Sequence, residues 1–233
     1  VFAATEKEKM PAYVLLNPIK IDDHLGPYVG PYDKKDSPGR WNDTIDVPMY
    51  RWIGSLNATI NAKYDNESLY IRVKSLSEKT ITGYDLCRIY LDPLHNGTST
   101  LPQKDDFSIV TYWLPPTRCL AEIRYGNGSG WGERINSLPN GTLLVRGVVD
   151  SFISPTSGCL VYEFNIPRNL IGKNIKNLGF GVFLAYKYNT NWQDPEGSSL
   201  WPYGFTANFD SIGILEYKSV PIPEFGMFGL ILL

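Results

Sequence analysis

The stretch LDPLHNGTSTLPQKDD, residues 91–106, places oxygen-bearing side chains at a spacing that suits a hard cation. Asp92, Asn96 and either Asp105 or Asp106 could converge there with backbone carbonyls. Ca²⁺ prefers about six to eight such oxygen ligands. The alternative is that Asp-Pro and Asn-Gly simply build turns. The sequence therefore predicts a candidate calcium site, with turn formation as the competing interpretation.

Aromatic residues in polar or glycine-rich loops are candidates for binding sugar rings. Trp131 lies in YGNGSGWGER, Trp192 in NTNWQDPEG, and Trp201 and Tyr203 in SLWPYG. An indole ring packs on the apolar face of a pyranose while nearby polar side chains bind its hydroxyls. The alternative is that these rings cap the ends of a core. That alternative is favoured for Trp201, which precedes a proline, and remains open for Trp131 and Trp192.

Nothing in the sequence predicts catalysis or nucleic-acid binding. GxSxG, HExxH, P-loop and strand-associated GxGxxG motifs are all missing. Neighbouring acids such as Asp22-Asp23 point in different directions and make poor acid–base pairs. The formal net charge is −2 and basic runs are short, which argues against a nucleic-acid partner. We expect a protein that is not an enzyme and that carries no cofactor other than calcium.

Six Asn-x-Ser/Thr acceptors exceed the number expected by chance from 16 asparagines and predict an N-glycosylated, extracellular protein. The three cysteines Cys87, Cys119 and Cys159 leave at least one thiol unpaired or paired between chains. Connectivity cannot be derived from the sequence, and a Cys119–Cys159 bridge is a working hypothesis. The acceptors are Asn42, Asn57, Asn66, Asn96, Asn127 and Asn140.

Apolar residues alternate with polar ones along most of the chain, which is typical of strands rather than helices. Residues 58–75 show two such runs around Asp65-Asn66 and predict a hairpin. Only residues 166–173 have a helix-like pattern. The pattern predicts an all-β, single antiparallel β-sandwich of about ten to eleven strands with little helix. The other strand candidates are 12–21, 47–52, 88–91, 107–113, 120–125, 143–149, 160–166, 179–188 and 212–217.

The order of several short motifs resembles the family 9 carbohydrate-binding modules. The motifs are KIDDHLG, DNESLYIRVK, RIYLDPLHNGTS, DDFSIV, VYEFNIPRNLIG, GFGVFLAYKY and LWPYG, spread over residues 19–217. The resemblance implies a jelly-roll-like sandwich that binds a glycan and often holds structural calcium. Some relatives of this sandwich bind haem or belong to redox complexes, so the fold alone leaves the ligand open.

The chain ends in VPIPEFGMFGLILL, residues 220–233, which resembles the start of the archaeal Pro-Glu-Phe sorting signal. In that signal a PEF motif opens a transmembrane helix, and here the apolar run is shorter than the roughly 20 residues that cross a bilayer. We expect a domain at 19–217, an N-terminal extension at 1–18, and a linker and apolar tail at 218–233. The tail is either the stub of a membrane anchor or a donor strand, and the extension at 1–18 is a second candidate donor.

Two classes of function follow from these observations. In the first, a cell-surface module is tethered through its C-terminus and binds a glycan or another surface polymer. In the second, the chain is a structural subunit of an archaeal surface filament or surface layer and joins copies of itself by strand addition. A haem-binding or redox-complex subunit is a third interpretation.

Overall fold

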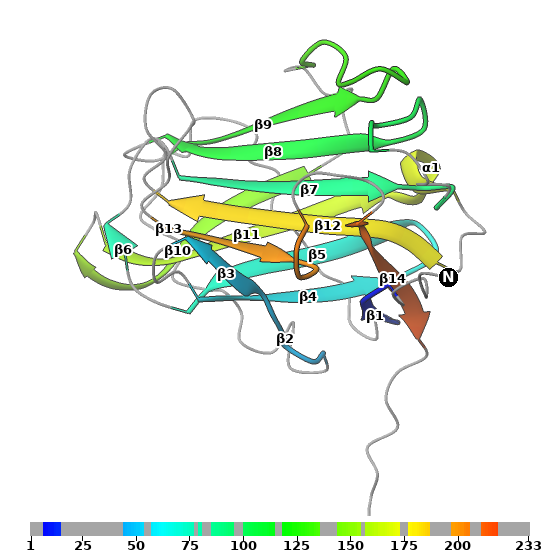
Figure 1. Ribbon diagram of the computed structural model, residues 1–233. Helices are drawn as coiled ribbons and strands as arrows, with labels where there is room; N and C mark the ends of the chain where they lie inside the picture. Colours follow the sequence, from blue (N-terminus) through cyan, green and yellow to red (C-terminus); the bar gives the residue numbers. More distant parts are fainter. Residues whose placement is uncertain are drawn as a thin grey trace, which may run out of the picture.

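The computed structural model describes residues 7–14, 44–53, 57–76, 79–80, 85–95, 100–114, 118–135, 144–154, 157–172, 177–186, 197–205 and 211–218. This part of the chain is nearly all β, with one short helix, α1 (Arg168–Ile171). Two sheets pack face to face, and in Figure 1 β7 and β12 cross the view in front of β11, with β8 and β9 above them. The predicted all-β sandwich is confirmed.

The first sheet has the order β10-β11-β5-β4, and every pair in it is antiparallel. Two-residue strands extend it, because β2 pairs with β4 and β6 with β11. Its strands are β2 (Val47–Pro48), β4 (Ala58–Tyr64), β5 (Ser68–Ser75), β6 (Lys79–Thr80), β10 (Leu144–Ser154) and β11 (Ser157–Pro167).

The second sheet has the order β3-β13-β12-β7-β8-β9, again antiparallel throughout. This sheet carries most of the residues considered below as a functional site. Its strands are β3 (Tyr50–Ile53), β7 (Leu86–Asp92), β8 (Phe107–Leu114), β9 (Arg118–Tyr125), β12 (Asn177–Tyr186) and β13 (Gly197–Trp201).

Two strands close the sandwich along one side. β1 (Lys9–Val14) runs parallel to both β4 and β14 (Gly213–Lys218), and β14 is antiparallel to β12. Met10 and Ala12 of β1 are buried in the core between the sheets. Residues 9–14 are therefore part of the sandwich, and their assignment to an N-terminal extension is corrected. β1 pairs with β14 from Lys9 to Tyr13 and with β4 at Tyr13 and Val14, so these residues form strand pairs within their own chain.

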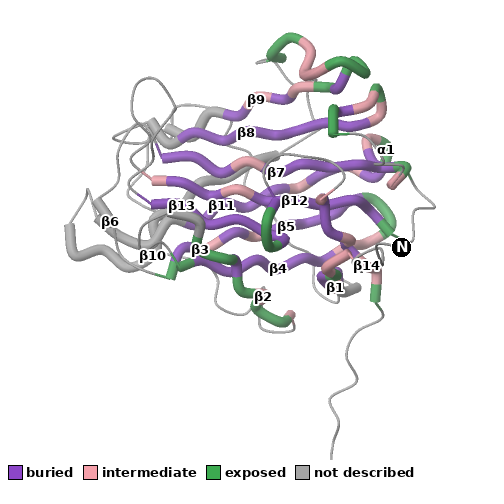
Figure 2. Tube along the Cα trace, in the orientation of Figure 1, coloured by how far each residue is buried: buried purple, intermediate pink, exposed green. Residues whose placement is uncertain are grey.

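The core lies between the two sheets, as the period-two pattern requires. Figure 2 shows buried backbone along nearly the full length of β4, β5, β7 and β12, with exposed residues at turns and in β2. Ile60, Ile71, Ile89 and Val182 are among the residues that fill this core. The predicted hairpin is confirmed, since β4 pairs with β5 from Tyr64↔Leu69 to Ala58↔Ser75.

Several boundaries differ from the sequence prediction. The run at 47–52 forms two strands, because β2 pairs with β4 whereas β3 pairs with β13. Met49, between them, is buried in the core and donates its backbone N–H to Ala58 O of β4 at 2.8 Å. β13 was not predicted, because GSSLW is typical of a turn. Its Ser198 and Ser199 are fully buried, and the strand forms through pairing with β12 and β3. The helical prediction at 166–173 is reduced to the single turn of α1.

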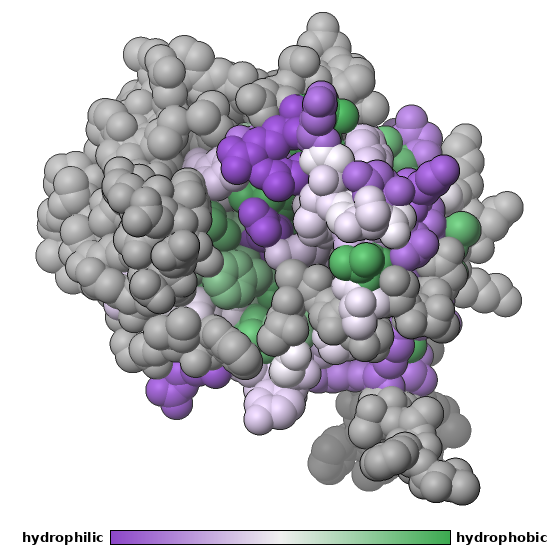
Figure 3. Space-filling view, turned by 45° about the horizontal axis from the view of Figure 1, so that its top comes forward, coloured by the Kyte–Doolittle hydropathy of each residue, from purple (hydrophilic) through white to green (hydrophobic). Residues whose placement is uncertain are grey.

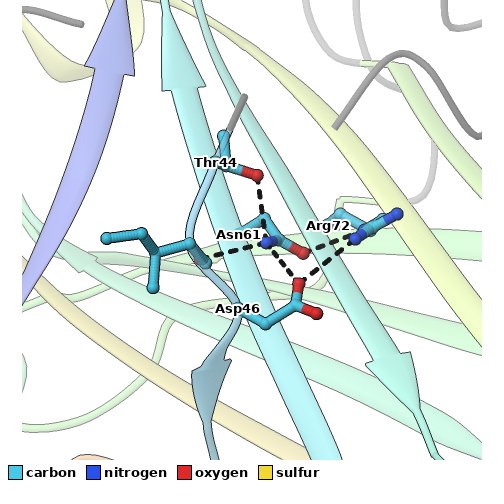
Figure 4. A network of polar contacts seen from close by, with 5 residues as sticks. Thr44, Asp46, Asn61 and Arg72 are labelled. Atoms are coloured by element: carbon cyan, nitrogen blue, oxygen red, sulfur yellow. Dashed lines mark hydrogen bonds and ion pairs between the residues drawn. The ribbon is translucent and has the colours of Figure 1, made fainter. Parts of the chain in front are cut away.

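A polar network fastens residues 44–46 to the outer face of the first sheet (Figure 4). The Asn61 side-chain amide is buried and donates to Thr44 Oγ1 at 3.1 Å, Ile45 O at 3.0 Å and Asp46 Oδ1 at 2.6 Å. Its oxygen accepts from Arg72 Nε at 2.9 Å, and Arg72 Nη2 lies 3.4 Å from Asp46 Oδ1. Since buried polar groups need partners, this network fixes how the chain enters β2.

Among the described residues, no helix has the length and apolar character needed to cross a membrane. The apolar tail at 219–233, with its PEF motif, lies outside the described residues.

Candidate functional site

Three carboxylates meet where β7 ends and β8 begins. Asp92 is the last residue of β7, and Asp105 and Asp106 immediately precede β8. Each offers a ligand atom, and these atoms all lie within 4.8 Å of one another. Asp92 and Asp106 are fully buried, and Asp105 is partly buried. The structure thus brings together three of the four predicted metal ligands, and the fourth, Asn96, lies outside the described residues.

Two carboxylates of this cluster, Asp105 and Asp106, each have a buried oxygen without a hydrogen-bond donor. Asp106 Oδ2 accepts from the Gln103 backbone N–H at 2.6 Å. Asp105 Oδ2 and Asp106 Oδ1 are buried without a hydrogen-bond partner. Buried oxygens of this kind are costly unless a cation or donor meets them. Their number and oxygen chemistry fit Ca²⁺, which binds carboxylates and carbonyls.

The pKa of Asp106 is raised from 3.8 to about 7, mainly by burial and to a smaller extent by the negative charges of Asp92 and Asp105. The hydrogen bond from Gln103 opposes this shift but does not cancel it. Close carboxylates in a poorly solvated place disfavour one another's charged form. A divalent cation would reverse this effect, because it stabilises all three charges at once.

The loop that carries Asp105 and Asp106 is held by the turn after β9. Gly126 N donates to Asp106 O at 2.8 Å, and Gly128 N donates to Pro102 O at 3.1 Å. A Cβ on Gly126 would overlap the Gln103 carbonyl oxygen, so only glycine permits this approach.

His95 closes the turn that follows Asp92. Its backbone N–H donates to Asp92 O at 3.2 Å, and it has a left-handed φ of 47°. Its pKa is lowered, first by burial and then by the positive charge of Lys7, while Asp92 opposes the shift. A neutral imidazole beside the carboxylates leaves their negative charge uncompensated.

The outer face of the second sheet carries aromatic and charged side chains. Antiparallel partners share a face, so Phe183, Arg88, Val110 and Glu122 form one row across β12, β7, β8 and β9. Arg88, Tyr90 and Asp92 follow one another along the same face of β7, because side chains alternate along a strand. The carboxylate cluster therefore adjoins this face.

Trp131 joins this outer face from the turn after β9. It is partly buried and packs against a small cluster that includes Tyr90, Leu200 and Phe205. The Trp131 and Tyr90 ring centroids are 6.0 Å apart at an interplanar angle of 48°, and Tyr90 and Phe205 meet edge to face at 5.0 Å. The guanidinium of Arg88 lies 5.8 Å from the Tyr90 ring centroid. We call Arg88, Tyr90, Trp131, Phe183 and Phe205 the aromatic face.

The space-filling view, taken from the side on which β7, β8 and β12 lie, shows a hollow where hydrophobic side chains adjoin strongly hydrophilic ones (Figure 3). A concave surface with apolar rings and a few polar groups is the usual form of a small-ligand site.

The remaining aromatic candidates lie elsewhere. Trp201 is 0% exposed and packs on Phe180 in the core, so it is removed from the sugar-binding candidates; the position before Pro202 already favoured this. Tyr203 is 77% exposed and meets Tyr50 edge to face at 5.3 Å. Glu8 binds this pair through the Tyr50 hydroxyl and the Tyr203 backbone N–H, both at 3.0 Å. Trp192 lies outside the described residues.

Sequence reasoning missed Arg88, Tyr90 and Phe183. The signal that could have identified them is the alternation in LCRIYLD, residues 86–92, in which Arg88, Tyr90 and Asp92 fall on one face. Their assembly with Phe205, which follows a different strand, has no local signal in the sequence.

Three glycosylation acceptors fall within the described residues, and Asn57, Asn66 and Asn127 are all exposed. Ser129 donates from its hydroxyl and its backbone N–H to Asn127 Oδ1, each at 2.9 Å. The acceptors at Asn42, Asn96 and Asn140 lie outside the described residues.

Cys87 is buried in the core. Cys119 lies in β9 and Cys159 in β11, and their side chains are outside the described set.

Comparisons with solved structures give matches at low sequence identity. A family 9 carbohydrate-binding module from Caldicellulosiruptor kristjanssonii in complex with glucose has a TM-score of 0.57 and 14% identity, and the match covers 91% of this chain and 98% of that one. The same module with cellotriose has a TM-score of 0.58, 14% identity and coverage of 91% and 96%. A protein from Bacteroides uniformis has a TM-score of 0.54, 9% identity and coverage of 91% and 100%.

At these identities the likeness establishes the fold alone, which is similar to that of these family 9 modules. No protein-family model and no curated protein matches the chain.

Proposed function

We propose that this protein is a non-catalytic module that binds a glycan on the aromatic face. The observation that carries the proposal is the position of Trp131, a partly exposed indole that packs on Tyr90 beside the Arg88 guanidinium. A flat ring next to hydrogen-bond donors fits the apolar face and the hydroxyls of a sugar. The family 9 modules of the same fold, which hold glucose and cellotriose, support this assignment.

The carboxylate cluster is proposed to hold Ca²⁺ through Asp92, Asp105 and Asp106. The buried oxygens without hydrogen bonds support the assignment. The ion would neutralise charge and tie the end of β7 to the start of β8, so its role is structural. It would also stiffen the loop that abuts the turn bearing Trp131, since Gly126 and Gly128 bond to that loop.

The proposal extends to the place where the protein works. The exposed acceptors Asn57, Asn66 and Asn127 support N-glycosylation outside the cytoplasm. The PEF-like tail supports attachment to a cell surface. The alternative, a surface subunit joined by strand addition, now depends on the tail rather than on β1, which is committed to its own sheet.

The test is retention of the full chain in affinity gels that contain a panel of polysaccharides. Trp131→Ala is expected to weaken retention about tenfold or more, as expected for a central aromatic contact, while Trp131→Phe keeps most of it. Tyr203→Ala is the matched control, because it removes a more exposed ring at a different place. Thermal melting of each variant separates lost binding from lost folding.

Unchanged retention in Trp131→Ala would refute the aromatic face as the site. Loss of retention in Tyr203→Ala alone would move the site to the Tyr50–Tyr203 pair.

A further inference from the structure

Three arginines gather on and beside the aromatic face. Arg88 is on β7, Arg124 on β9, and Arg134 follows Trp131 in the next turn. Across the strands Tyr90 pairs with Ser108 and Ser108 with Arg124, which puts Arg124 on the same face as Tyr90. Arg134 reaches the face through Glu122, since Arg134 Nη1 lies 3.5 Å from Glu122 Oε1.

Two other guanidiniums lie close enough to Arg124 to act on its charge. Among the described side chains, the guanidiniums of Arg134 and Arg88 lower the pKa of Arg124, whereas Tyr112 and the carboxylate of Glu122 raise it. Glu122 is already shared, because its Oε2 accepts from the Tyr112 hydroxyl at 3.0 Å while its Oε1 faces Arg134. Both carboxylate oxygens of Glu122 are therefore engaged by groups other than Arg124.

Arg124 is the member without a partner. In the described part of the chain no hydrogen bond or ion pair joins its side chain to another residue, and its Nε is buried. Its pKa is lowered, first by burial and then by Arg134 and Arg88. A partly desolvated cation that repels its neighbours is unfavourable unless an anion joins it. The planar guanidinium group of arginine forms bidentate hydrogen bonds with planar carboxylates.

We propose that the aromatic face binds a glycan whose sugars bear carboxylates, with Arg124 and Arg134 binding the carboxylate while Trp131 packs on the sugar ring. This inference rests on the proposed function and adds the charge of the ligand. Arg88 lies over the Tyr90 ring and donates from Nη1 to the Tyr90 hydroxyl at 3.3 Å, so it orients this ring and adds positive charge.

The experiment measures binding of the full chain by calorimetry to matched sugars. The probes are a homogalacturonan oligomer, the same oligomer with its carboxylates methyl-esterified, a sulfated galactan and a neutral cello-oligosaccharide. We expect the acidic oligomer to bind, esterification to weaken binding about tenfold or more, and added NaCl to weaken the acidic oligomer selectively.

Charge-removing variants sharpen the test. Arg124→Gln and Arg134→Gln are each expected to weaken binding of the acidic oligomer about tenfold and to leave the esterified oligomer unchanged. The Arg134 side chain is 56% exposed, so this variant tests the idea even if Arg124→Gln folds poorly. Arg51→Gln, an exposed arginine on β3, is the control and should bind as the parent does.

Equal binding of the esterified oligomer, unchanged binding in both arginine variants, or preference for the sulfated galactan would overturn the carboxylate assignment. If neutral sugars bind through Trp131 and acidic ones gain nothing, the proposed function stands and this inference fails. If Trp131→Ala leaves binding of every sugar unchanged, the proposed function itself fails.

Discussion

Gly179 faces Asp92 across the β12–β7 pair so closely that a Cβ on Gly179 would lie 2.7 Å from the Asp92 Cβ. Real Cβ contacts are not this short, so the absence of a side chain at 179 is what lets Asp92 lie against β12 beside Asp105 and Asp106. The geometry of the carboxylate cluster therefore depends on a strand that supplies no ligand.

Gly179→Ala should displace Asp92 and lower the free energy of unfolding by about 1–3 kcal/mol, the usual cost of overpacking. Urea unfolding measures this loss, and calcium should then stabilise the variant less than the parent. Gly132→Ala is a milder control, because its Cβ would lie 3.1 Å from Tyr125 O. Equal stability of parent and Gly179→Ala would show that Asp92 does not need this space.

Calcium should stabilise the folded protein. A ligand present at a concentration of about a hundred times its dissociation constant raises the free energy of unfolding by about 2.7 kcal/mol. For a domain of this size, this corresponds to a rise of about 5–10 °C in melting temperature. Asp105→Asn should lose most of this gain, whereas Glu133→Gln, an exposed acid outside the cluster, should keep it. Melting in CaCl₂ and in EDTA measures the difference, and identical midpoints would contradict a calcium site.

The stability of the calcium-free protein should fall as pH rises from about 4 to about 7. The pKa of Asp106 is raised from 3.8 to about 7 in the folded state, so its contribution is fully present below pH 3.8 and is lost as pH rises through about 7. The lowered pKa of His95 has the opposite effect on stability. Its contribution to the stability of the folded state is present above pH 6.5 and is lost as pH falls below that value.

Asp106→Asn isolates the first effect, since the amide does not titrate. We expect the variant in EDTA to lose less stability than the parent between pH 5 and pH 8 by urea unfolding. Parallel profiles would assign the pH dependence to other groups.

The buried amide of Asn61 should matter for stability even though it lies on the other sheet. Asn61→Ala would remove the hydrogen bonds that the Asn61 side chain makes to Arg72 and to residues 44–46. We expect this loss to lower the free energy of unfolding by about 2–4 kcal/mol. A double-mutant cycle with Asp46→Ala measures the coupling, and additive losses would mean that the two residues act separately.

Local chemistry explains the parts that sequence reasoning predicted well. In the β4–β5 hairpin, Asp65 Oδ1 accepts from the backbone N–H of Glu67 and Ser68 at 2.8 and 2.7 Å. This turn is a property of neighbouring residues, and the alternation on either side of it requires no distant partner. Asp92 and Asp106 were identified from the spacing of oxygen-bearing residues in 91–106. They meet because consecutive antiparallel strands bring the end of β7 next to the start of β8.

The sequence-based predictions were wrong where pairing with a strand distant in the sequence determines whether a segment forms a strand. GSSLW became β13 because β12 and β3 supply hydrogen-bond partners on both sides, which its composition does not indicate. Residues 9–14 joined the sandwich because β14, some two hundred residues later, offers a parallel edge to them. Pairing of this kind is set by sheet order and not by the propensity of the segment.

The amino-acid sequence by itself determined the all-β class, the β4–β5 hairpin and three of the carboxylates at one strand junction, because alternation, turn chemistry and hairpin connectivity act over short distances. Only the tertiary structure decided which aromatic rings share a surface. The sheet order β13-β12-β7-β8-β9 brings Phe205, Phe183, Tyr90 and Arg124 together and puts Trp201 in the core. A side chain's face follows from its own strand, but its neighbours on that face come from strands remote in sequence.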